Sequence, residues 1–190
     1  ASIFLGCDNL TSIVVEEDNP MYDSRGNCNA IIKTATNELI RGCQSTIIPN
    51  SVTSIGRSAF NSCTGLTSIT IPDGVTNIGS SAFNGCKDLI SITIPNSVIS
   101  IDSYAFHNTN LPIENNIRYA DTWAVEVTNG SSTYTLRDNT TGIADNMFQY
   151  YWDMKKITLP NGLKYIGKYA FQDCYDLTSL TIPNSMKSIG

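Results

Sequence analysis

The phenylalanines of this chain recur at one fixed interval. Three of them are 23 residues apart, and a second pair keeps the same spacing: Phe60, Phe83 and Phe106, then Phe148 and Phe171. A fixed period of this length is typical of a solenoid, in which each coil stacks on the last and one side chain per coil builds an internal column. The sixth, Phe4, precedes Phe60 by 56 residues, which corresponds to one period and one coil lengthened by about ten residues.

The repeated unit begins at a proline and predicts one coil of such a solenoid. Units from Pro49 and Pro72 are PNSVTSIGRSAFNSCTGLTSITI and PDGVTNIGSSAFNGCKDLISITI. Residues Leu66–Ile71 alternate between apolar and polar and end at a proline, which predicts a short strand. A tight helical or 3₁₀ turn is expected at Ser80–Phe83. One coil buries too little apolar surface to fold alone, so stacked coils are expected to join these strands into a parallel sheet.

The phrase IPxSVTSIGxxAFxxCxxLTSITIP resembles the BspA-like class of leucine-rich repeats, and the resemblance covers nearly the whole chain. It implies an α/β leucine-rich-repeat solenoid, predominantly β. The expected architecture is a right-handed coil of about eight turns with a parallel sheet on the concave face, short helical or 3₁₀ turns opposite, and two β-hairpin irregularities. Both ends of the chain fall inside a repeat, so residues 1–190 are expected to be a single solenoid domain from a longer protein.

The charge of the chain argues against a nucleic-acid partner. Charged residues make up only 15% of the sequence, and the formal net charge is −5, whereas phosphate binding needs a stripe of lysine and arginine. The cluster of Lys155, Lys156, Lys164 and Lys168 indicates a solvated face or a modest basic patch. No apolar run approaches the roughly 20 residues of a membrane span, so no membrane insertion is expected in this segment. Nothing at Ala1 resembles a signal peptide.

Two irregular stretches interrupt the period. The first is a lengthened coil over residues 16–42, in which Asn29–Lys33 and Glu38–Gly42 are strand-like runs. They predict a β-hairpin that projects from the solenoid. The second is a degenerate coil over residues 107–142, in which Trp123–Thr128 and Thr133–Arg137 flank Asn129 and Gly130. Asn-Gly between strand-like runs predicts a second hairpin there.

Aromatic side chains gather in and beside the second irregular stretch. They include both tryptophans: Tyr119, Trp123, Tyr134, Phe148, Tyr150, Tyr151 and Trp152. They either fill a gap left by the short coil or form a binding hot spot. Tyr134 occupies a core strand position and is expected to be structural. The candidates for exposure and ligand binding are Tyr150, Tyr151 and Trp152, which follow the Phe148 turn.

Hydroxyl side chains dominate the outward positions of the predicted strands. The candidate ligand-binding residues on this face are Ser68, Thr70, Ser91 and Thr93, with Lys156 at the equivalent position of a later coil. Serine and threonine suit a flat sheet through β-propensity and cross-strand hydroxyl bonds. A structural role and a broad, low-affinity face for an extended protein or glycan therefore remain open.

Cysteine and histidine show no catalytic or metal-binding pattern. Four cysteines follow a repeat phenylalanine by three residues: Cys7, Cys63, Cys86 and Cys174. Neighbouring coils would bring such residues within disulfide reach, but small buried thiols are the favoured interpretation. Cys43 is expected in the core, and Cys28 is expected to be exposed. His107 has no nucleophile or carboxylate partner recognisable by motif, so no catalytic residue, metal or cofactor is predicted.

Two hypotheses for the function follow. The resemblance implies adhesion by a non-catalytic recognition module, at an extracellular, cell-surface or secreted location, because the class is widespread in surface proteins of host-associated bacteria and some protists. Its ligand would be a protein or glycan on host or neighbouring cells. In the alternative, the solenoid is a structural spacer or stalk that presents another domain. An enzyme would need a convergent cluster of polar side chains that the sequence does not indicate.

Overall fold

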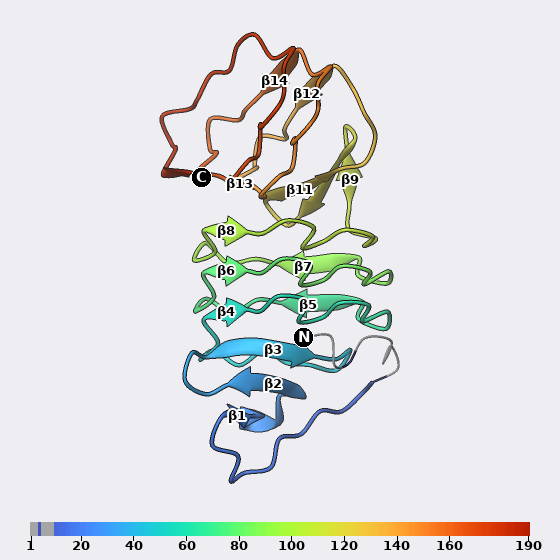
Figure 1. The fold of residues 1–190 in the computed structure, drawn as a ribbon, viewed down its shortest axis with the longest axis vertical. Coiled ribbons are helices and arrows are strands. Elements are labelled where there is room, and N and C mark those ends of the chain that lie inside the picture. The colour runs from blue at the N-terminus through green and yellow to red at the C-terminus, as the bar shows by residue number, and fades with distance from the viewer. Residues whose placement is uncertain (1–3, 5–9) are drawn as a thin grey trace.

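The chain folds into a solenoid whose coils stack along the long axis of the molecule (Figure 1). The computed structural model describes residue 4 and residues 10–190. It contains about six coils and almost no helix, which confirms the predicted fold class. The predicted number of turns was too high, because the two irregular stretches form hairpins instead of complete coils. The helical segment of the described chain is the 3₁₀ turn Arg25–Asn27.

The strand predicted from the alternation of apolar and polar residues is confirmed. It forms two parallel pairs: β5 (Ser68–Thr70) with β7 (Ser91–Thr93), and β12 (Thr133–Thr135) with β14 (Lys156–Thr158). In both pairs the residues opposite each other are 23 apart in sequence, as Ile69 and Ile92 are. The repeat period is therefore the register of the sheet.

A second parallel ladder, which the sequence analysis missed, runs along another side of the coils (Figure 1). Its strands are only two residues long, too short for an alternating pattern to be visible in the sequence. They are β4 (Ser54–Ile55), β6 (Asn77–Ile78) and β8 (Ser100–Ile101), and in the later coils β13 (Gly142–Ile143), β15 (Tyr165–Ile166) and β16 (Ser188–Ile189). Pairing again follows the period, with Ile55 beside Ile78 and Ile78 beside Ile101.

The first predicted hairpin is confirmed, but it does not project from the solenoid. Strands β2 (Ala30–Lys33) and β3 (Glu38–Gly42) pair antiparallel, and β1 (Tyr22–Asp23) adds to β2. Strand β3 then pairs in parallel with β4, with Leu39 opposite Ile55. The hairpin thereby joins a six-stranded sheet of order β1-β2-β3-β4-β6-β8, because the free edge of β4 satisfies the backbone groups of β3.

A second hairpin is present, but the prediction that Trp123–Thr128 pairs with Thr133–Arg137 was wrong. Strand β11 (Trp123–Val127) pairs antiparallel with the preceding β10 (Ile117–Ala120), which also pairs with β9 (Ile113–Glu114). The turn uses Asp121 at a φ of 52°, whereas β12 is held in the solenoid by its 23-residue register with β14. Strand β11 runs parallel to β13 within the sheet β16-β15-β13-β11-β10-β9.

The phenylalanine side of each coil consists of successive hydrogen-bonded turns, and the helical or 3₁₀ turn predicted at Ser80–Phe83 does not form. Around Phe83, positive φ angles occur at Ser81 (57°) and Gly85 (74°), and such residues cannot continue a right-handed helix. The Phe83 amide donates to the carbonyl of Ala105 in the next coil at 2.7 Å, while the Cys86 amide donates to Phe83 within the coil at 3.2 Å. Hydrogen bonds within and between coils thus alternate along this side.

The expected phenylalanine column is present in two segments. Ring centroids are 4.9 Å apart between Phe60 and Phe83, 5.1 Å between Phe83 and Phe106, and 5.4 Å between Phe148 and Phe171. Within each pair the ring planes differ by no more than 6°. The segments are separated where the period breaks, and there Trp123 stacks on Tyr165 with centroids 5.8 Å apart.

Truncating the middle of the column should destabilise the whole stack. Phe83 is completely buried between two other rings, so Phe83→Ala is expected to lower the free energy of unfolding by about 3–5 kcal/mol. Chemical denaturation measures this loss. The exposed Thr70→Ala on β5 is the control, with an expected change within about 0.5 kcal/mol. A loss below about 1 kcal/mol for Phe83→Ala would mean that the column is not a packed core.

The close approach of hairpin and column provides a second test. A Cβ atom added to Gly42, at the end of β3, would overlap the ring of Phe60, whereas one added to Gly130 would meet nothing within 4 Å. Gly42→Ala is therefore expected to lower the free energy of unfolding by about 1–3 kcal/mol, and Gly130→Ala to leave it nearly unchanged. Equal thermal midpoints for the two variants would contradict this packing.

Candidate functional site

Three aromatic side chains of the irregular region lie in the core, which confirms the gap-filling interpretation for them. Tyr119, Trp123 and Tyr134 are each no more than 2% exposed. Both tyrosine hydroxyls accept a hydrogen bond, since the Arg137 amide donates to the Tyr119 hydroxyl at 3.2 Å and the Ser131 amide to the Tyr134 hydroxyl at 2.8 Å. The Arg137 guanidinium also lies 4.0 Å from the centre of the Tyr119 ring. These residues hold the degenerate coil together.

Tyr151 was expected to be exposed, and this expectation was wrong. Its ring is partly buried in edge-to-face contacts with Phe148 at 6.0 Å and Tyr134 at 6.1 Å. Burial raises the pKa of its hydroxyl. Tyr151 stands three residues after Phe148, where Cys86 and Cys174 follow their own phenylalanines. The sequence therefore contained the signal that this position faces inward.

Tyr150 and Trp152 are exposed as expected, and the fold adds a third aromatic residue. The exposed fractions are 56% for Tyr150, 59% for Trp152 and 75% for Tyr175. Backbone hydrogen bonds join the two loops, from Asp176 to Trp152 at 3.1 Å and from Tyr150 to Gln172 at 3.0 Å. We call Tyr150, Trp152 and Tyr175 the aromatic corner. The sequence analysis missed Tyr175, although it follows Trp152 by one period of 23 residues.

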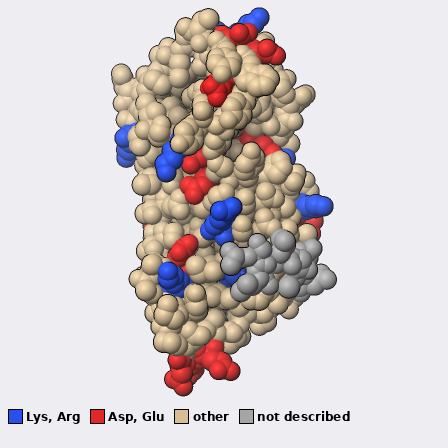
Figure 2. All heavy atoms as spheres, in the orientation of Figure 1, with Lys and Arg blue, Asp and Glu red and all other residues tan. Residues whose placement is uncertain are grey.

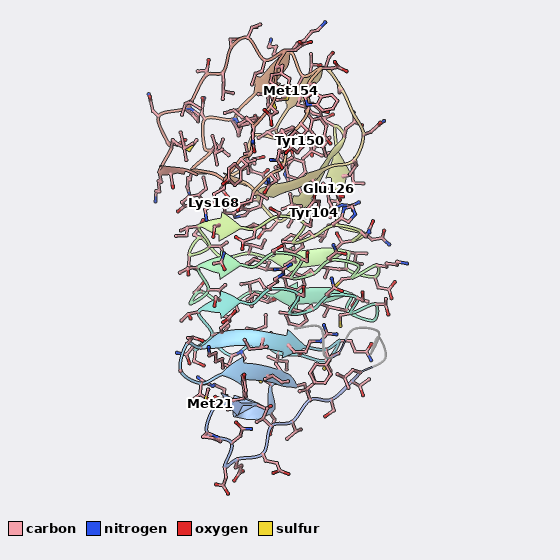
Figure 3. The ribbon with its side chains drawn as sticks, in the orientation of Figure 1. Met21, Tyr104, Glu126, Tyr150, Met154 and Lys168 are labelled. Atoms are coloured by element: carbon pink, nitrogen blue, oxygen red, sulfur yellow. The ribbon has the colours of Figure 1, made fainter. Side chains whose placement is uncertain are left out.

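Carboxylates flank the aromatic corner. Asp153 directly follows Trp152, Asp176 directly follows Tyr175, and both are exposed. Asp173 is two residues before Tyr175 and is partly exposed. The Tyr175 hydroxyl donates to Asp173 Oδ1 at 3.0 Å, and this neighbouring carboxylate raises the pKa of Tyr175. The corner lies in the C-terminal half of the stack, where Figure 3 marks Tyr150. It combines flat apolar surface with negative charge.

The predicted hydroxyl face is present and points outward. Ser68, Thr70, Ser91 and Thr93 are all exposed, with Ser68 opposite Ser91 and Thr70 opposite Thr93. The expected cross-strand hydroxyl bonds do not form between these described residues. Their hydroxyl groups therefore remain available to water or to a ligand.

Lys156 is exposed on β14, opposite Thr133. It belongs to a separate two-stranded sheet from that of Ser68 and Ser91. The predicted site residues are thus distributed over the aromatic corner and two sheets, and the structure does not bring them together into one site. Charged side chains on the visible face form small groups of either sign, which are separated by wide uncharged areas (Figure 2).

His107 has a carboxylate partner that the sequence analysis missed. Its Nδ1 lies 2.5 Å from Glu126 Oε1, and the other oxygen of Glu126 accepts from Arg118 Nε at 2.7 Å. Arg118 Nη1 also donates to the carbonyl of Leu111 at 3.1 Å. Glu126 lies 19 residues away in β11, so only the β10–β11 hairpin brings it near. The cluster fastens this hairpin to the Phe106 turn, and no hydroxyl or thiol nucleophile of the described chain hydrogen bonds to His107.

The described cysteines are packing elements. Cys43 is in the core as expected, but Cys28 is only 2% exposed, which contradicts its predicted exposure. Its segment is covered because the hairpin joins the sheet. The Cys86 thiol donates to the Phe60 carbonyl of the preceding coil at 3.0 Å, and Cys174 donates in the same way to Phe148 at 3.1 Å. Cys7 lies outside the described residues.

A cavity of about 780 Å³ lies beside the first hairpin. Its walls combine apolar side chains such as Val15 and Ile40 with charges of both signs, including Glu38 and Arg41. Arg41 Nη1 donates to the carbonyls of Ser58 and Asn61 at 3.3 and 3.2 Å. That side chain therefore ties β3 to the next turn. The residues that line the cavity come from separate parts of the sequence, so no sequence motif indicated it.

The described residues contain no helix suited to crossing a membrane and no group of potential metal ligands. None of their helices is long and apolar enough to cross a bilayer. No three of their histidine, cysteine, aspartate or glutamate side chains are grouped so that they could hold a metal ion.

The repeat geometry agrees with a known family. The model of the BspA-type leucine-rich-repeat region, with six copies, matches residues 37–150 and 89–190. The chain belongs to the BspA-type leucine-rich-repeat family. A comparison of this BspA-type chain with curated proteins finds no match.

Solved leucine-rich-repeat structures resemble this BspA-type chain over most of its length. A leucine-rich-repeat protein from Eubacterium ventriosum is 25% identical with a TM-score of 0.54, over 95% of this chain and 50% of that protein. The leucine-rich-repeat protein of T. pallidum is 21% identical with a TM-score of 0.43, over 87% and 69% of the two chains. A leucine-rich cell surface protein from Faecalibacterium prausnitzii is 23% identical with a TM-score of 0.43, over 91% and 56%. The BspA-type chain thus spans about half the length of two of these proteins.

The thiols should differ sharply in reactivity in the native protein. Burial raises the pKa of Cys86 to about 12, and the thiolate is the reactive form. Iodoacetamide at neutral pH is therefore expected to modify the partly exposed Cys174 well before Cys86, as followed by peptide mass spectrometry. Denaturant should abolish the difference. Equal labelling of both cysteines in the native protein would contradict the burial of the Cys86 thiol.

Proposed function

We propose that this chain is a non-catalytic recognition module of a bacterial cell-surface protein. Its ligand is a protein or glycan on a host or neighbouring cell. Membership of the BspA-type family supports a binding role, and the aromatic corner is the observation that carries the proposal. Three exposed aromatic side chains from two adjacent coils are a feature that solenoid packing does not require.

Exposed aromatic residues are costly for a soluble surface and useful in an interface. Tryptophan and tyrosine are enriched among the few residues that dominate binding energy, because they bury a large rigid surface at small entropic cost. Tyr119, Trp123, Tyr134 and Phe148 are accounted for by the core. The free hydroxyls of β5 and β7 provide a second, flatter surface that favours a broad and weak contact.

The spacer hypothesis remains as the alternative. Regular serine and threonine ladders need no ligand, since they suit a parallel sheet by β-propensity alone. A spacer would bind nothing by itself, and its role would depend on another domain. Catalysis is not part of the proposal, because His107 and Glu126 fasten a hairpin and approach no nucleophile in the described chain.

A solid-phase screen of the purified chain against matrix proteins, plasma proteins and immobilised glycans tests the proposal. The double variant Tyr150→Ser with Trp152→Ser is expected to weaken binding about tenfold or more, which corresponds to at least ~1.4 kcal/mol. Both side chains are exposed, so the unfolding midpoint should change little. Tyr151 is left intact because it packs on Phe148.

Tyr104→Ser is the matched control, because Tyr104 is also an exposed tyrosine at a left-handed turn position but lies in an earlier coil. It should bind like the unaltered chain. Failure to bind any target would favour the spacer. Binding that is insensitive to the double variant would place the ligand elsewhere, and Ser68→Glu with Ser91→Glu would then test the hydroxyl face.

A further inference from the structure

We infer that the aromatic corner binds a cationic segment of polypeptide, whose lysine or arginine side chains lie over the exposed rings and pair with the flanking aspartates. This inference deepens the function proposed above and rests on it.

Tyr150 is a bulky, exposed side chain at a turn position where the other coils have small or polar residues. Tyr150 has a φ of 65°, and the equivalent position two residues after Phe83 is Gly85, with a φ of 74°. The same position also has a positive φ in the other coils, at Ser62, Asn108 and Asp173, so the turn itself sets this backbone conformation. It suits the small or polar residues found there and is unfavourable for a bulky side chain such as tyrosine. Tyr150 is 56% exposed, and its side chain makes no hydrogen bond or ring contact within the described chain. Packing therefore does not explain this tyrosine.

The three rings of the corner are free to receive a partner. Trp152 and Tyr175 occupy the same position in successive coils, and neither stacks on another aromatic ring of the described chain. Tryptophan presents the best face for a cation, and tyrosine follows. Successive coils are about 4.8 Å apart at hydrogen-bonded strand spacing, so the corner suits an extended segment that runs along the stack and places side chains on adjacent coils.

Charge selects a cationic partner over an acidic or neutral one. The two loops, residues 149–153 and 172–176, contain Asp153, Asp173 and Asp176 and no lysine or arginine. Lys155 and Lys156 follow at the start of the next side of the coil, where Lys156 enters β14. Carboxylates beside aromatic faces attract ammonium and guanidinium groups and repel anions. The long apolar stem of a lysine or arginine can also cover the rings.

Fluorescence anisotropy with labelled peptides of repeating Gly-Ser-Lys and Gly-Ser-Glu sequence tests the inference on the intact chain. The lysine peptide is expected to bind, and the glutamate peptide and an acetylated lysine peptide to bind at least about tenfold more weakly. Binding should weaken as salt is added, because the aspartates are exposed to solvent. Emission of the exposed Trp152 should change on binding, since the other tryptophan, Trp123, is buried.

Two sets of variants locate the site. Trp152→Ser with Tyr175→Ser, and separately Asp153→Asn with Asp173→Asn and Asp176→Asn, are each expected to weaken binding of the lysine peptide about tenfold or more. The aspartate variant should also lose most of the salt dependence. Tyr104→Ser is the control for an exposed tyrosine outside the corner and should bind normally. Circular dichroism checks that each variant is folded.

Several outcomes would overturn the inference. They are equal binding of the lysine and glutamate peptides, no binding of the lysine peptide, or affinity unchanged in both corner variants. Salt-independent binding of a neutral oligosaccharide that is lost in Trp152→Ser with Tyr175→Ser would assign the corner to glycans instead. In each of these cases the solid-phase screen can still show binding elsewhere on the chain, so failure of the inference and failure of the proposed function are distinguishable.

Discussion

Contact between successive coils at a 23-residue register is the interaction on which the rest of the structure depends. Each coil is too small to bury its apolar side chains alone, and it gains a core only when the next coil covers it. Stacked phenylalanines about 5 Å apart and backbone hydrogen bonds such as that from Phe83 to Ala105 act at the same place. Side-chain packing and backbone pairing therefore enforce one period.

The two hairpins show how this architecture accommodates an interruption. In each, the last strand of the hairpin pairs in parallel with a strand of the second ladder: β3 pairs with β4, and β11 pairs with β13. Small residues make the contact, since Gly42 abuts Phe60 and Gly142 abuts Trp123. The irregular segments are thereby built into the sheets, and their polar side chains, such as His107 and Glu126, serve as fasteners.

The same repetition separates packing positions from positions that are free to vary. Residues at and three after each phenylalanine face inward, which accounts for Cys86 and Tyr151 alike. Residues two and four after it face solvent, and there the chain places Gly85 in one coil but Tyr150, Trp152 and Tyr175 in later ones. A recognition surface can thus be changed on a solenoid without disturbing its core.

The sequence by itself determined the solenoid, the β5-type strand and the outward hydroxyl face, because a fixed period and a two-residue alternation are local properties of the chain. It also indicated that Tyr150 and Trp152 are exposed. Only the tertiary structure decided that Cys28 is buried, that β11 pairs with β10, and that His107 meets Glu126. Those outcomes depend on which segments meet across coils, and short strands and hairpin partners compete for the same edges by contacts that no single stretch of sequence contains.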